Sequence, residues 1–395
     1  MIRRVELVLP LFVALSACIG DSPTGSTPDG GSDAPGPNDV RGIVVDQFNA
    51  PIDGISVRID DELSTTSNGG KFFAPNVRAK YDAYAAVVSG DQKSLVGYLE
   101  LSTRTPTLRL RRLDVPFHKA TFTGSMVGAS SPLSGCVFAY EGYSGSFPLQ
   151  SPQFKLAANW YDFAPQVRLL VFPTTRSSAG YDLIDTTVTA VPGAQALGAL
   201  TPSQGSGGYY TWSGTMSLSQ ATLVGTDGTE CYILGNASIG PIDIPAVPSA
   251  SVRLVFTSPL TQQQDVGYLV KTATVINGAD YGALVPPPIA VLTSPVQDGS
   301  FDEASVASWQ GGTGSYSVVF FAKDYQAEII TQRTSMSFPD VKIQNDLAAP
   351  RPRGVDGALS VTSTSSRISS DEWAVAQPPP MLSYSRSTRS VKSSP

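Results

Sequence analysis

Short segments in which apolar and polar residues alternate recur along this chain from Val40 onward, separated by glycine, proline and asparagine. Val40–Asp46 and Gly54–Ile59 are two of them, and Ser67–Gly70 supplies a tight-turn signal soon after. A period of two residues is typical of strands, because successive side chains point to opposite faces. Only 15% of the 395 residues are charged, whereas glycine (36) and proline (31) are abundant. The sequence therefore predicts an all-β, multi-domain chain of β-sandwiches.

Residues 1–17 have the layout of an export signal. Arg3 and Arg4 form a positive start, and the apolar run Val5–Leu15 is too short to span a bilayer. A twin-arginine signal is an alternative interpretation of the arginine pair, although the surrounding residues lack the rest of that pattern. The sequence predicts a segment that is removed on export.

The signal ends in Leu15-Ser16-Ala17-Cys18, which resembles the lipobox of bacterial lipoproteins. The resemblance implies that Cys18 becomes the acylated first residue of the mature protein and anchors it to the membrane through palmitate-like chains. Each buried acyl CH₂ contributes about 0.8 kcal/mol, and stable anchoring takes more than one chain. Ile19, rather than Asp, implies sorting to the outer membrane if the host has two membranes. The alternative is an ordinary cleaved signal with an unmodified cysteine.

Residues 18–39 are expected to form a disordered tether behind the lipidated cysteine, because this Gly/Pro/Ser/Asp-rich stretch has too little apolar surface to offset its ordering entropy. Residues 378–395 are also polar and carry Arg386, Arg389 and Lys392 without an acidic residue. The same argument predicts a disordered tail there.

Residues 40–113 resemble the carboxypeptidase regulatory-like domain, a transthyretin-like β-sandwich. The matching residues are Val40, Gly42, Val44, Asp46, Pro51, Ile52, Gly54, Val57, Thr66, Gly70, Phe72 and Val77. Ala74 departs from the family pattern, where a bulky apolar residue is usual. The resemblance implies about seven strands in a spacer or docking module, and no catalytic activity.

Residues 114–285 contain a series of strand-like runs and are expected to form one β-sandwich or jelly-roll-like body. Cys136 and Cys231 lie in two of these runs, and Cys18 is the third cysteine of the chain. If Cys18 is acylated, the other two are a natural pair in an exported protein, so we predict a Cys136–Cys231 disulfide. Two buried free thiols are the alternative.

Residues 286–377 begin with Pro286–Pro288, which suits a stiff linker. Trp309 and Tyr316 then follow at a spacing that resembles a fibronectin type III-like sandwich, in which an early tryptophan packs under a strand that carries a tyrosine. An immunoglobulin-like sandwich is the alternative.

Catalytic and metal motifs are scarce in the sequence. His118 is the single histidine, which argues against a zinc peptidase site and a Ser-His-Asp arrangement, and we interpret it as a strand residue. No metal, cofactor or catalytic residue is predicted. The net charge of −6 gives no electrostatic case for a nucleic-acid partner.

Two aromatic clusters are the candidates for ligand contact. Trp160 and Tyr161 form one, and Tyr209, Tyr210 and Trp212 form the other. Aromatic rings beside polar side chains can provide a platform on which sugar rings stack. The alternative is that Tyr210 and Trp212, which share one strand face, belong to the core.

These observations favour a membrane-anchored cell-envelope lipoprotein with a non-catalytic scaffolding or binding role, whose partner is a glycan or another envelope protein. One alternative is a carbohydrate-binding surface lipoprotein. The other is a hydrolase with a carboxylate pair in the middle body, because the two carboxylates of such a site can lie far apart in the sequence.

Overall fold

The fold was analysed on a computed structural model. It describes residues 36–47, 49–112, 117–139, 143–147, 152–161, 166–174, 177, 180–234, 241–258, 265–274, 278–301, 305–312, 314–339, 341–351, 355–364, 369–375 and 383–393. Cys18, the signal segment and most of the tether lie outside these residues. The described chain is all-β and multi-domain, as the alternating pattern predicts, with two short helices among its many strands.

The first module holds seven strands in two facing layers. They are β1 (Val40–Val45), β2 (Ser56–Ile59), β3 (Glu62–Thr65), β4 (Lys71–Ala74), β5 (Tyr81–Ser89), β6 (Gln92–Leu101) and β7 (Thr107–Arg109). β1 lies between antiparallel β4 and parallel β7, and β3, β2, β5 and β6 follow one another in the second layer. Val44, Val57 and Phe72 are buried between the layers.

The middle of the chain contains fifteen of the strands. They are β8 (Phe117–Met126), β9 (Leu133–Phe138), β10 (Tyr143–Phe147), β11 (Gln153–Tyr161), β12 (Gln166–Pro173), β13 (Tyr181–Thr189), β14 (Gly193–Leu200), β15 (Ser203–Gly205), β16 (Gly207–Gly214), β17 (Ser217–Gly225), β18 (Glu230–Leu234), β19 (Ile242–Pro245), β20 (Ala250–Thr257), β21 (Asp265–Thr274) and β22 (Ala279–Leu284).

This middle part differs from the single body expected for residues 114–285, because it has two hydrophobic cores. The sheet β15-β13-β12-β9 contributes to both of them. In β12, Leu169 and Val171 face one core while Leu170 and Phe172 face the other. Burial on both faces explains why β12 is apolar almost throughout instead of alternating.

The C-terminal module packs around a further core that contains Trp309, Phe320 and Phe338. Its elements are β23 (Val291–Ser294), β24 (Gly299–Phe301), β25 (Val306–Gln310), β26 (Tyr316–Ala322), β27 (Tyr325–Thr331), β28 (Ser335–Ser337), α1 (Val341–Asp346), β29 (Gly357–Thr364), α2 (Ser370–Trp373) and β30 (Ser383–Ser393). Ser369 and Glu372 cap the start of α2 reciprocally, which satisfies backbone N–H groups that the helix leaves free.

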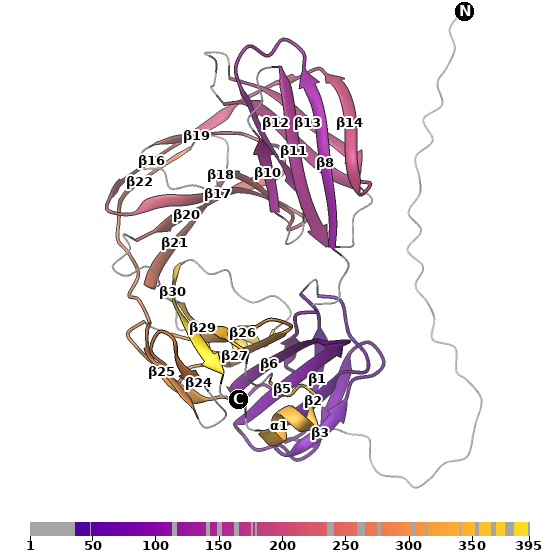
Figure 1. Ribbon diagram of the computed structural model, residues 1–395, viewed down its shortest axis with the longest axis vertical. Coiled ribbons are helices and arrows are strands. Elements are labelled where there is room, and N and C mark those ends of the chain that lie inside the picture. Colours follow the sequence, from indigo (N-terminus) through magenta and orange to yellow (C-terminus); the bar gives the residue numbers. More distant parts are fainter. Residues whose placement is uncertain are drawn as a thin grey trace, which may run out of the picture. The chain divides into compact units, whose positions relative to one another are not determined.

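Strand pairing joins these modules. β27 pairs in parallel with β6 of the first module, and β30 lies between β29 and β21, antiparallel to both. A 13-stranded sheet results, in which β18, β17, β20 and β21 are followed by β30, β29, β26 and β27 and then by β6, β5, β2 and β3 (Figure 1). The thirteenth strand, β24, lies off this path and pairs in parallel with β30. β5 and β6 are buried on both faces, because Tyr84 and Leu95 contribute to the C-terminal core while Val96 and Tyr98 face the first core.

The tail differs from the predicted disorder, because residues 383–393 form β30. Ser387, Arg389 and Val391 are buried, although the strand is mostly polar. Backbone pairing on both sides satisfies its main chain. Its buried polar side chains have hydrogen-bond partners, and this compensation cannot be inferred from composition.

A buried ion pair accounts for those partners. Arg389 donates from Nη1 and Nη2 to the two carboxylate oxygens of Asp265, at 2.8 and 3.2 Å, and Ser387 Oγ donates to Asp265 Oδ1 at 2.6 Å. Burial by itself would raise the pKa of Asp265, but the hydrogen bonds from Arg389 and Ser387 and the charge of Arg389 outweigh it. The pKa of this carboxyl group is therefore lowered. This pair links β30 to β21 through side chains as well as backbone.

Candidate functional site

The second aromatic cluster does not form a flat platform. Tyr209 is 53% exposed, whereas the neighbouring Tyr210 is completely buried and stacks on Tyr281 at a ring distance of 6.4 Å. Trp212 packs edge-on against Phe256, with ring centroids 5.1 Å apart. The strand period explains the split, because adjacent residues of β16 point to opposite faces. Tyr210 and Trp212 thus belong to the core, which was the alternative interpretation.

Trp160 and Tyr161 end β11, where their backbones pair with His118 and Phe117 of β8. The side chains of Trp160 and Tyr161 lie outside the described residues. His118 occupies a strand position, in agreement with its interpretation as a strand residue.

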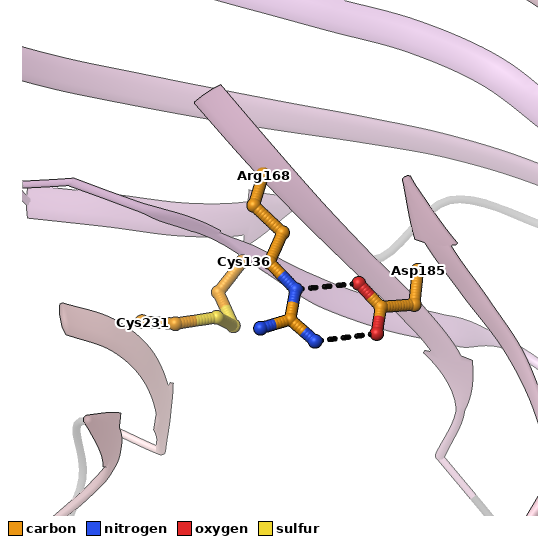
Figure 2. Close-up of a disulfide and its surroundings, with 4 residues drawn as sticks. All are labelled: Cys136, Arg168, Asp185 and Cys231. Carbon is orange, nitrogen blue, oxygen red and sulfur yellow. Dashed lines mark hydrogen bonds and ion pairs between the residues drawn. A yellow bond between two sulfur atoms is a disulfide. The ribbon is translucent and has the colours of Figure 1, made fainter. Parts of the chain in front are cut away.

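The predicted disulfide is present. Cys136 of β9 and Cys231 of β18 are both completely buried and are joined across a Cα–Cα distance of 5.4 Å. Beside the disulfide, Arg168 donates to both carboxylate oxygens of Asp185, at 2.7 and 2.6 Å (Figure 2). This hydrogen-bonded pair raises the pKa of Arg168, so the guanidinium stays charged. The disulfide and the ion pair connect strands and have no feature of a catalytic site.

Within the part of the chain that the structure describes, no group of three or more His, Cys, Asp or Glu residues is placed to hold a metal ion. In the same residues, no helix has the length and apolar character needed to cross a membrane.

The first module has a surface groove that sequence analysis missed. It has a volume of about 760 Å³. Its lining includes Arg41, Gly42 and Ile43 of β1, Lys71, Phe72 and Phe73 of β4, Ser64 and Thr65 of β3, and the neighbouring residues Ser67, Thr105 and Pro106. This size is typical of ligand sites.

The groove runs along β1 and β4 of the sheet β4-β1-β7 and reaches β3 of the second layer. Arg41 and Ile43 alternate with the buried Val40 and Val44, so they point away from the core. Across β4, Phe73 pairs with Arg41 and Lys71 pairs with Ile43. The two cationic residues are therefore diagonal neighbours on one face, and such positions are about 7–8 Å apart.

The charges in this groove have no acidic counterpart. Among the described residues, no carboxylate lies within ion-pair distance of Arg41 or Lys71. The Arg41 guanidinium instead lies 5.2 Å from the centre of the Phe73 ring, and Phe73 is 45% exposed. Six described arginines do contact a carboxylate, namely Arg58, Arg78, Arg168, Arg253, Arg333 and Arg389. Arg41 and Lys71 differ from these six because their charges face the groove without a described partner of this kind.

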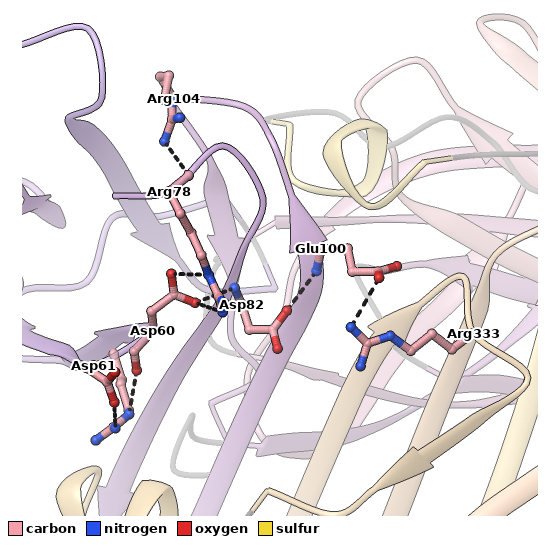
Figure 3. Close-up of polar contacts among 8 residues, drawn as sticks. Asp60, Asp61, Arg78, Asp82, Glu100, Arg104 and Arg333 are labelled. Carbon is pink, nitrogen blue, oxygen red and sulfur yellow. Dashed lines mark hydrogen bonds and ion pairs between the residues drawn. The ribbon is translucent and has the colours of Figure 1, made fainter. Parts of the chain in front are cut away.

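A second pocket, of about 530 Å³, is lined by acidic residues of the first module and by Ile343 of α1. Three of its carboxylates, those of Asp60, Asp61 and Asp82, are engaged in internal contacts. Arg78 donates to both carboxylate oxygens of Asp60, at 2.8 and 2.6 Å, and this pairing raises the pKa of Arg78. Asp82 accepts from the Glu100 backbone, and the Glu100 side chain contacts Arg333 of the C-terminal module (Figure 3). These contacts connect segments of the first module to one another and to the C-terminal module, which is a structural role.

The sequence carries one signal for these cations, because Arg41 and Lys71 are charged residues next to apolar or small residues of β1 and β4. Their pairing across two strands and the absence of acidic neighbours were not visible, because both depend on the register of β1 against β4. Alternation indicates which side chains point outward, but not which of them meet.

Comparisons with known proteins identify no family. No family model matches the chain, and no curated protein matches it. Among solved structures, the major pilin subunit BcpA of Bacillus cereus matches with 7% sequence identity and a TM-score of 0.15 and covers 63% of this chain and 99% of its own. A streptococcal ancillary pilin matches with 8% identity and a TM-score of 0.16, covering 62% and 98% respectively. The shaft pilin SpaA of Lactobacillus rhamnosus GG matches with 8% identity and a TM-score of 0.15, covering 63% and 99%. TM-scores this low do not establish a shared fold.

Proposed function

We propose that this protein is a lipid-anchored bacterial cell-envelope lipoprotein with a non-catalytic scaffolding or binding role. The observation that carries the proposal is the strand pairing between modules. β27 pairs with β6 over six residue pairs from Tyr325 to Ile330, and β30 pairs with β21 over five. Separating the modules would break these backbone hydrogen bonds and expose the strands β5 and β6, which are buried on both faces. A body joined in this way holds its surfaces at fixed positions, as a scaffold must.

The sequence supplies the anchor of the proposal. Leu15-Ser16-Ala17-Cys18 has the residue types that lipidation requires, and two or three acyl chains on Cys18 would hold the protein at a membrane. Ile19 supports an outer-membrane location in a host with two membranes. Residues 18–39 would then link the lipidated cysteine to the first strand, which begins at Val40.

Two family relationships are part of the proposal. Seven strands in two layers between Val40 and Arg109 support a carboxypeptidase regulatory-like domain at residues 40–113. Trp309 packs on Tyr316 with ring centroids 5.2 Å apart, which supports the fibronectin type III-like relationship of residues 286–377. Both relationships favour accessory modules over a catalytic domain.

Lipid anchoring is tested by cell fractionation and intact mass. The native protein should sediment with membranes, and its mass should correspond to a chain that starts at Cys18 and carries a diacylglycerol. Cys18→Ala should release the protein from the membrane, whereas Ser26→Ala in the tether should leave it bound. A Cys18→Ala protein that stays in the membrane fraction to the same extent would overturn the anchor.

A further inference from the structure

We infer that the β1–β4 groove binds an anionic polysaccharide whose sugar units carry carboxylates. The inference deepens the binding role and rests on the proposed function for its setting at a cell surface. It is carried by three properties of the groove, namely its open cations, its exposed aromatic ring and its hydroxyl-rich lining.

The cations define the charge of the ligand. Arg41 and Lys71 lie on one sheet face, both are exposed, and no described carboxylate neutralises either of them. Arginine presents a planar fork that suits a carboxylate, and lysine provides a mobile point charge. Because diagonal positions on a sheet are about 7–8 Å apart, the two long side chains can reach acidic groups on adjacent units of a polymer.

The ring and the hydroxyl groups favour a sugar. Phe73 exposes almost half of its surface in the groove and has the Arg41 guanidinium near its ring. An apolar ring surface can pack against the C–H face of a sugar. Ser64, Thr65, Ser67 and Thr105 add hydroxyl groups, which both donate and accept hydrogen bonds.

Ser64 gives an independent indication that the groove is built for a polar ligand. Its Oγ atom is buried and has no hydrogen-bond partner in the described part of the protein. An unpaired buried hydroxyl is costly, so a native structure that retains one calls for an explanation. Rotation of the Ser64 side chain toward the groove would let a ligand hydroxyl supply the missing partner.

The geometry favours a polysaccharide over an acidic peptide. Extended peptides commonly bind by adding a strand to a sheet edge, where backbone N–H and C=O groups are free. The contacts in this groove would instead come from side chains of three strands, β1, β3 and β4. A peptide that crossed these strands would leave its own backbone groups without a matching ladder, whereas a sugar needs only side-chain contacts.

The test uses the full chain with Cys18→Ala, so that binding is measured without a lipid anchor, and calorimetric titration as the readout. The probes are a four-unit oligomer of galacturonic acid, a four-unit oligomer of galactose and tetraglutamate. We expect binding of the uronate oligomer that weakens as salt rises, because exposed charges are screened. Binding of the neutral oligomer should be at least tenfold weaker.

Variants locate the site. Arg41→Gln and Lys71→Gln should each weaken uronate binding about tenfold, which corresponds to about 1.4 kcal/mol. Phe73→Ala should weaken the binding of the uronate oligomer by a similar factor. Lys80→Gln removes an exposed cation from the same module but outside the groove and should leave affinity unchanged. Thermal unfolding of each variant verifies that the module is still folded.

Several results would overturn the inference. They are no binding of the uronate oligomer, equal binding of the neutral oligomer, tighter binding of tetraglutamate, or equal losses in Lys80→Gln and Arg41→Gln. None of these depends on Cys18, so a failure of the groove and a failure of the anchor are separate outcomes. A folded Arg41→Gln protein with unchanged uronate affinity would also remove the groove from consideration.

Discussion

The ion pair between β21 and β30 offers the sharpest test of how the modules are joined. Asp265→Asn keeps the shape of the side chain but removes its charge. The side chains of Asp265 and Arg389 are only 5% and 9% exposed. The substitution therefore leaves the Arg389 guanidinium buried without its anionic partner. It also replaces one of the two oxygens that accept from Arg389 with an amide nitrogen, which cannot accept a hydrogen bond.

The magnitude follows from this burial. Removing one member of a buried ion pair costs about 3–5 kcal/mol, because the remaining charge has lost the water that would otherwise solvate it. If β30 opens as a local unit, the free energy of that opening falls by the same amount. Since about 1.4 kcal/mol corresponds to a factor of ten, the amides of β21 and β30 should exchange with solvent at least about 100-fold faster.

Hydrogen–deuterium exchange of the full chain measures this effect by mass spectrometry of peptides from β21, β30 and the first module. Arg78→Gln is the matched control, because it breaks an ion pair with Asp60 in which Arg78 is 68% exposed. A pair of that kind contributes only about 0–1 kcal/mol. The double variant Asp265→Asn with Arg389→Met should cost less than the two single changes added together. Exchange of β30 that stays within threefold in Asp265→Asn would refute the reasoning.

The same pair predicts an acid dependence. The pKa of Asp265 is lower in the folded protein than in the unfolded chain, where an aspartate titrates near its ordinary value of 3.8. Its stabilising contribution is therefore complete above that ordinary value and is lost as the pH falls through the lowered folded pKa. Protection of β30 should decrease below about pH 4 in the wild type. It should depend less on acid in Asp265→Asn.

Three further predictions concern the rest of the fold. Cys136→Ser with Cys231→Ser should lower the stability of the middle part by about 4.7 kcal/mol in the chain-entropy model, because the disulfide joins residues separated by 95 positions. An unchanged melting temperature would contradict this. Gly42→Ala should lower the free energy of unfolding by about 1–3 kcal/mol, because a Cβ there would lie 2.2 Å from the Phe72 ring and 2.6 Å from the Pro106 carbonyl oxygen. In urea, the first module should then unfold at a lower midpoint concentration. Burial raises the pKa of Tyr98 and of Tyr210 to about 12. The contribution of the two protonated hydroxyl groups to folding stability is therefore complete below pH 10 and is lost as the pH rises through 12. Unfolding midpoints that stay constant between pH 8 and 12 would argue against this prediction.

Sequence by itself determined the class of fold and the location of most strands, because a strand with one buried face carries its period in its own residues. Val40–Val45 alternates and forms β1 as expected. The cysteine count also predicted the Cys136–Cys231 pair, since few pairings are open to so few cysteines. Strand alternation is a local property, and the cysteine pairing follows from the small number of possible pairs. Neither prediction requires knowledge of contacts between distant residues.

Tertiary structure decided how the strands meet. β30 is too polar to be predicted as ordered, and it is ordered because Asp265, distant in sequence, compensates Arg389. The sharing of β12 between two cores turned an expected single body into two. The groove likewise depends on a register that brings Arg41 opposite Phe73 and keeps carboxylates away. Charge compensation and strand register are relations between residues far apart in the chain, and the periodicity of a single segment carries no information about them.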